Sequence, residues 1–152
     1  MTIHVCSRTA FLVRRDGDRR PSWSPRIGPL EWCREKLWPV NHKLQPVTLS
    51  GVADPDGDLV TVQIVGVTQD EPLQGLGDGN TAVDANITGA NTVSLRAERS
   101  GGGNGRVYRI HFQATDDKGA QCDGSVAVCV SHDAQPNTVC VDDGQSYDST
   151  AQ

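Results

Sequence analysis

Five segments between residues 47 and 132 alternate between apolar and polar side chains, with the two-residue period of a β-strand. They are VTLSGV, LVTVQIVGV, TVSLRAER, RVYRIHFQAT and GSVAVCVSH, and clusters of Gly, Asp, Asn and Pro separate them. A strand of this period turns one set of side chains toward a core and the other toward water. Short alternating strands joined by turns are typical of an antiparallel sandwich, so the sequence predicts an all-β fold of about seven strands.

The segment RVYRIHFQA shows the alternation most clearly, and a sixth, short strand is expected around residues 84–88. Successive side chains of a strand point to opposite faces, so each parity class shares one environment. We expect the even class to face the core, namely Tyr108, Ile110, Phe112 and Ala114. We expect the odd class to face water, namely Val107, Arg109, His111 and Gln113.

The composition also favours strands over helices. Sixteen Gly, eight Pro and a single Met argue against a helical bundle and for many turns. No run of about eighteen apolar residues occurs, so the sequence predicts no membrane insertion.

Charge and periodicity divide the chain into unlike parts. Residues 1–36 hold eight Arg or Lys and four Asp or Glu, whereas residues 37–152 hold six basic and fifteen acidic residues. The acidic part repels nucleic acid and suits cations, and the arginines of the head are scattered, so no nucleic-acid partner is expected. We predict an irregular N-terminal arm (1–36), the sandwich (37–133) and a polar C-terminal tail (134–152).

Three of the five cysteines lie near the C-terminus, and strand parity suggests how they pair. Cys122 and Cys129 are seven residues apart, which places them on opposite faces of a regular strand. Cys129 points outward, where a tail folding back can bring Cys140 to it. We therefore predict a Cys129–Cys140 disulfide, with Cys122 free or paired to a cysteine of the head, Cys6 or Cys33. The alternative is a set of inert buried thiols.

Carboxylates gather in the turns and raise the question of a calcium site. Calcium takes six to eight oxygen ligands, so a site needs several carboxylates together. If the strands ending at TQDEP and ATDDKG run in the same direction, Asp70, Glu71 and Asp116 share one end of the sandwich. The DPDGD turn then lies at the other end. Asp is also an ordinary turn residue, so both readings stay open.

The chain from residue 37 to about residue 147 resembles a bacterial Ig-like, cadherin-like module of secreted and cell-surface proteins. The resemblance rests on WPVNHK (38–43), DEP (70–72), LRAER (95–99) with the following Gly-rich turn, and the His-Asp pair at 132–133. It implies an antiparallel Ig/cadherin-like β-sandwich. The arm at residues 1–36 does not resemble the family.

The resemblance also implies calcium at the ends of the domain. By position, Asp70 and Glu71 of DEP and Asp116 of ATDDKG match the family's ligands, and Asp54, Asp56 and Asp133 are further candidates. In tandem modules the neighbouring domain often supplies ligands, so the expected partners are neighbouring domains or subunits of a surface protein.

No enzyme is expected, because the chain has no GxSxG motif and its four histidines are dispersed. The predicted function is a non-catalytic, calcium-stabilised module for adhesion, spacing or assembly. The alternatives are a polysaccharide-binding accessory module of a secreted hydrolase and a strand-exchanging filament subunit. The expected location is extracellular or at the cell surface. No export signal is visible, so the chain is either a fragment of a longer secreted protein or a short protein with a novel arm.

Overall fold

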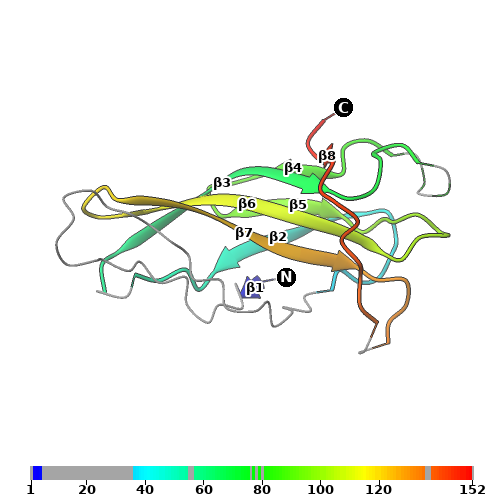
Figure 1. Cartoon of the computed structure of the whole chain (residues 1–152), viewed down its shortest axis with the longest axis horizontal. Coiled ribbons are helices and arrows are strands. Elements are labelled where there is room, and N and C mark those ends of the chain that lie inside the picture. The colour runs from blue at the N-terminus through cyan, green and yellow to red at the C-terminus, as the bar shows by residue number, and fades with distance from the viewer. Residues whose placement is uncertain are drawn as a thin grey trace.

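The computed structural model describes residues 2–4, 36–54, 57–75, 77, 79, 81–135 and 138–151. Within these residues the chain is all-β, and two sheets face each other as the layers of a sandwich (Figure 1). The predicted fold class is therefore confirmed. The N-terminal arm lies almost wholly outside the described residues, as do Cys6 and Cys33.

The first sheet has the strand order β1-β2-β5-β4. Its strands are β1 (Thr2–His4), β2 (Leu44–Ser50), β5 (Thr92–Arg96) and β4 (Ala85–Ile87). The second sheet has the order β7-β6-β3-β8. Its strands are β7 (Gln121–Val130), β6 (Arg106–Asp116), β3 (Val60–Gln69) and β8 (Tyr147–Asp148). All pairs are antiparallel except β1 with β2, which is parallel.

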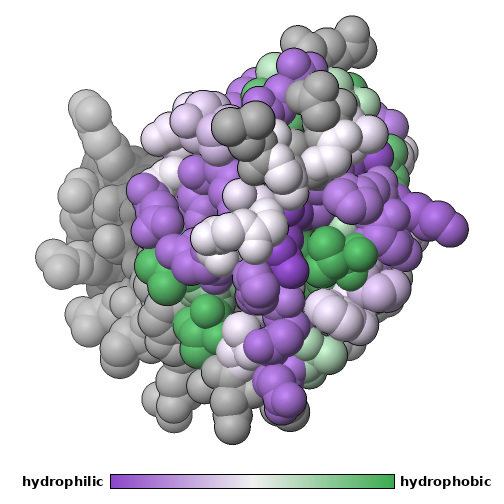
Figure 2. Space-filling model, turned by 90° about the vertical axis from the view of Figure 1, so that its right-hand side faces the viewer, coloured by the Kyte–Doolittle hydropathy of each residue, from purple (hydrophilic) through white to green (hydrophobic). Residues whose placement is uncertain are grey.

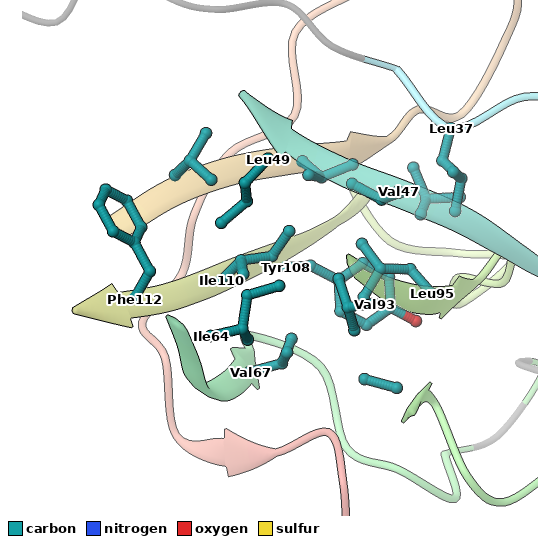
Figure 3. Packing of buried hydrophobic residues seen from close by; sticks show 14 of the residues in the cluster. Leu37, Val47, Leu49, Ile64, Val67, Val93, Leu95, Tyr108, Ile110 and Phe112 are labelled. Carbon is teal, nitrogen blue, oxygen red and sulfur yellow. The ribbon is translucent and has the colours of Figure 1, made fainter. Parts of the chain in front are cut away.

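The core lies between the two sheets and follows the predicted parity. Figure 3 shows Val47 and Leu49 of β2 facing Tyr108, Ile110 and Phe112 of β6. Each of these side chains is at most 5% exposed, so their removal from water is the main stabilising contribution of the sandwich. One expectation about β6 is wrong. Val107 belongs to the outward class but is only 5% exposed, and Gln145 of the C-terminal chain lies against it and donates to its carbonyl at 3.2 Å.

The C-terminal chain runs across the outer surface of the second sheet (Figure 1). We call residues 138–151 the C-terminal strap. Cys140 is bonded to Cys129 of β7 in the predicted disulfide, with the two Cα atoms 5.9 Å apart. Because the bond closes a loop of eleven residues, it contributes about 2–3 kcal/mol in the chain-entropy account. The tail thus extends the second sheet with β8, a strand that the sequence did not predict.

Cys122 is not in a disulfide and faces the core, as parity predicted. Burial raises the pKa of its thiol to about 11, with a further contribution from the carboxylate of Asp123. At neutral pH the thiol is therefore protonated and a poor nucleophile.

The direction of β3 relative to β6 decides which loops meet. Val60 is paired with Asp116, and Gln69 is paired with Tyr108. We call the end where β3 begins and β6 ends the aspartate end, on the left of Figure 1. The opposite end, where β3 ends and β6 begins, is the arginine end.

Candidate functional site

Three aspartates converge at the aspartate end. Asp54 follows β2, Asp58 precedes β3 and Asp116 is the last residue of β6. One carboxylate oxygen from each lies within 4.8 Å of the others. The antiparallel pairing of Val60 with Asp116 produces this arrangement, because it places the entry to β3 directly beside the exit from β6. The sequence placed these carboxylates at opposite ends of the sandwich.

The cluster concentrates negative charge around one lysine. Asp54 is 9% exposed. Asp116 Oδ1 accepts the backbone N–H groups of Lys118 and Ala120 at 2.9 and 2.7 Å, which fixes the turn between β6 and β7. The Lys118 ammonium lies 2.6 Å from Asp58 Oδ2. Three carboxylates offer the hard oxygens that calcium prefers, and backbone carbonyls or water would complete the shell.

Asp70 and Glu71 lie at the arginine end instead. Asp70 Oδ1 accepts the backbone N–H of Val107 at 2.9 Å. Burial raises the pKa of Asp70, and its backbone hydrogen bonds only partly offset that effect. Glu71 Oε2 accepts the backbone N–H of Ser100 at 2.8 Å and the Arg106 Nε–H at 3.1 Å. Both carboxylates thus hold loops against β6.

The two ends are too far apart to share an ion. β3 has ten residues between them, which corresponds to about 30 Å at 3.3 Å per residue. Asp116 therefore cannot bind the same ion as Asp70 and Glu71. The sequence-based arrangement required β3 and β6 to run in the same direction, but they are antiparallel.

Asp133, a further candidate ligand, joins neither group. Asp133 is exposed, and its Oδ1 accepts the backbone N–H of Gln135 and the hydroxyl of Thr138. These hydrogen bonds lower the pKa of Asp133 and cap a local turn. Asp56 lies outside the described residues.

The arginine end is built around Arg106, whose side chain is fully buried. Arg106 Nη1 donates to Asp84 Oδ2 at 2.8 Å and to the Tyr108 hydroxyl at 3.2 Å. The same nitrogen lies 4.0 Å from Glu98 Oε1. Asp84 and Glu98 are fully buried as well, and both lie against the guanidinium of Arg106.

Further pairs extend the cluster to the surface. Gln69 Nε2 donates to Asp84 Oδ2 at 2.8 Å, and Arg96 Nε lies 3.7 Å from Asp84 Oδ1. Desolvation raises the pKa of Asp84, while the Gln69 hydrogen bond and the Arg106 charge act against it. Glu98 Oε2 lies 3.0 Å from His42 Nδ1 and accepts the Thr81 hydroxyl.

The cluster joins segments of both sheets, because Arg106 and Gln69 belong to the second sheet and Arg96 to the first. Figure 2 views this end of the molecule, where the surface is mostly hydrophilic with separate hydrophobic patches. The charges of Arg106, Asp84 and Glu98 lie beneath that surface, with no exposed side-chain area.

Arg106 looks like a surface residue in the sequence. Together with Arg96, Arg99 and Arg109 it flanks the Gly-rich turn, a spacing that by itself suggests an exposed basic ladder, and the structure shows that this interpretation is wrong for Arg106. The parity that assigns Tyr108 to the core also assigns Arg106 there, so strand periodicity contained the signal. Its acidic partners could not be identified in the same way, because Glu71, Asp84 and Glu98 come from separate segments.

In comparisons with known proteins, no protein-family model, curated protein or solved structure matches the chain. Within the described residues, no helix is long and apolar enough to cross a membrane.

Proposed function

We propose that this protein is a non-catalytic, extracellular β-sandwich module of the Ig/cadherin-like kind. It acts in adhesion, spacing or assembly as part of a larger secreted or surface protein, with neighbouring domains or subunits as its partners. We further propose that calcium stabilises it at the aspartate end. The observation that carries the proposal is the convergence of Asp54 and Asp58, from the segment between β2 and β3, with Asp116 at the end of β6.

The location of the cluster supports a role in joining modules. Carboxylates at the end of an elongated domain lie where a neighbouring domain can add ligands to the same ion. Calcium needs six to eight oxygens, and three aspartates supply between three and six. A bound ion would also offset the repulsion among carboxylates held within 4.8 Å.

The disulfide supports the proposed location. Cys129 and Cys140 are bonded across the surface of the second sheet. Disulfides persist in oxidising compartments and are rare where thiols are kept reduced. An extracellular or cell-surface setting would therefore maintain this bond.

The contacts of the arginine end support a non-catalytic role for its acids. Glu71 holds the backbone of Ser100, and Asp84 binds Arg106 and Gln69. A general acid or base must reach a substrate. These carboxylates instead hold loops and side chains of the protein itself.

A thermal melt with calcium and with chelator tests the calcium proposal. At a calcium concentration one hundred times the dissociation constant, the free energy of unfolding should rise by about 2.7 kcal/mol. The variants Asp58→Asn and Asp116→Asn should lose most of this increase. Asp123→Asn is the matched control, because this exposed aspartate lies on β7 and outside the cluster.

The same melt can overturn the proposal in two ways. If calcium leaves the melting temperature of the wild-type chain unchanged, the isolated module has no calcium site. If calcium stabilises Asp58→Asn and Asp116→Asn as much as the wild type, the ion binds elsewhere.

A further inference from the structure

The C-terminal strap connects both sheets along one path. It is bonded to β7 through Cys140 and is paired to β6 through Asp142, whose carboxylate meets Arg109. It then pairs with β3 as β8, where Tyr147 lies opposite Gln69. Finally, the carbonyl of Ser149 accepts the backbone N–H of Ala85 in β4 of the other sheet. One strap thus covers a sheet surface and closes an edge between sheets.

The hydrogen bonds and ion pair that join the strap to the sandwich are polar, and most residues of the strap are exposed. The Arg109 and Asp142 side chains are 33% and 25% exposed, and water weakens such a pair. β8 is only two residues long. The apolar side chains of Val139, Val141 and Tyr147 are 36% exposed or more. Little apolar burial therefore offsets the entropy of ordering the strap.

The closed strap also buries a polar atom that has no partner. Ser149 Oγ, on the strap, is buried and makes no hydrogen bond. Desolvating a polar atom without a partner costs free energy, which opening of the strap would return by admitting water.

We infer that the Cys129–Cys140 disulfide is a redox latch that holds the C-terminal strap closed. A dithiol reductant supplies two electrons and two protons. The S–S bond breaks, Cys129 and Cys140 become thiols, and the dithiol becomes a disulfide. The strap then leaves the surface, Val107 and the β3 edge at Val67–Gln69 become exposed to water, and the rest of the sandwich stays folded.

Hydrogen exchange followed by mass spectrometry tests the latch in the full chain. Two amides act as reporters, because the Ser149 N–H donates to the Val67 carbonyl and the Ala85 N–H donates to the Ser149 carbonyl. In the reduced wild type, peptides of the strap should exchange at least about tenfold faster, as expected for a locally opening unit. Peptides of β6 and β7 should keep their protection.

A double variant separates this bond from other thiols. Cys129→Ser with Cys140→Ser should open the strap without reductant and should respond no further to it. Cys122→Ser removes a thiol outside the bond. Without reductant, its strap should exchange as slowly as that of the oxidised wild type. If the strap stays protected after reduction, its own contacts hold it and the latch is refuted. If β6 and β7 lose protection together with the strap, the disulfide supports the whole fold, which also overturns the inference.

Discussion

The two ends of the sandwich use the same kinds of charged residue in opposite ways. At the aspartate end, three carboxylates lie within 4.8 Å of one another and one partly exposed lysine approaches them. At the arginine end, carboxylates lie against guanidinium groups, and the side chains of Arg106, Asp84 and Glu98 are fully buried. The first arrangement presents three clustered carboxylates to an added cation, whereas the second contains its own cations.

Burial explains what each end contributes to the fold. A buried charge is costly without a partner, so every member of the arginine end depends on the others. A partly exposed charge retains much of its hydration, so the Lys118–Asp58 pair at the aspartate end contributes little by itself. The arginine end should therefore be sensitive to substitution, and the aspartate end should be sensitive to cations.

Arg106→Met should have the largest effect, because it leaves Asp84 and Glu98 buried without their shared guanidinium. Removing one partner of a buried ion pair typically costs about 3–5 kcal/mol. Urea denaturation should show a loss of this size in the free energy of unfolding. The matched control is Arg109→Met, which removes a partly exposed pair with Asp142 and should cost less than about 1 kcal/mol.

Arg106→Lys sharpens this test, because it keeps the charge but removes the planar fork that contacts Asp84 and Glu71. Its stability should lie between those of the wild type and Arg106→Met. If Arg106→Met is as stable as Arg109→Met, the buried cluster does not hold the arginine end together.

Gly124→Ala tests the apolar packing nearer the aspartate end. A Cβ atom at Gly124 would lie 2.5 Å from Cζ of Phe112, the residue opposite it on β6. The ring must shift, so we expect a loss of about 1–3 kcal/mol in a thermal or urea unfolding experiment. Gly66→Ala on β3 is the control, since nothing lies within 4 Å of the added atom. Equal effects of the two substitutions would show that the Phe112 contact is not the cause.

The fold was predictable because its signal is local. Alternation along RVYRIHFQA identified the core side chains Tyr108, Ile110 and Phe112 without knowledge of any partner strand. Alternation along β7 likewise placed Cys122 and Cys129 on opposite faces, which led to the prediction of the Cys129–Cys140 disulfide. β8 was not predictable, because two residues carry no periodicity.

The candidate site was less predictable because it depends on strand direction. The 36 residues between β3 and β6 hold two short strands of the other sheet, and β6 returns antiparallel to β3. No local sequence pattern indicates whether β6 runs parallel or antiparallel to β3. A wrong choice moves Asp116 from the end that holds Asp58 to the end that holds Asp70.

The effect of pH on Asp142, in the strap, should be smaller than the effect of substitutions in the buried cluster of the arginine end. Burial acts to raise the pKa of Asp142, but hydrogen bonds from Gln145, Arg109 and Gly144 prevail and lower it below its usual 3.8. Because the folded pKa is below the unfolded one, the stabilisation is complete above about pH 3.8 and is lost as the pH falls through the folded value.

Asp142→Asn should therefore lower stability by less than about 1 kcal/mol at pH 6, since the Arg109 pair is partly exposed. The difference from wild type should shrink below pH 3.8. Melting curves at pH 6, 4 and 3 measure it. A difference that stays constant over this range would mean that the carboxylate charge is not the stabilising feature.

Asp58→Asn in the presence of chelator should have the smallest effect. The substitution removes the contact with Lys118, but it also removes one of three crowded negative charges. These effects oppose each other, so we expect a net change of less than about 0.5 kcal/mol by thermal melting. Asp84→Asn is the corresponding change at the arginine end and should cost more, because Asp84 is fully buried against Arg106. A loss above about 2 kcal/mol for Asp58→Asn would show that both ends are held by internal ion pairs, and the contrast between them would no longer stand.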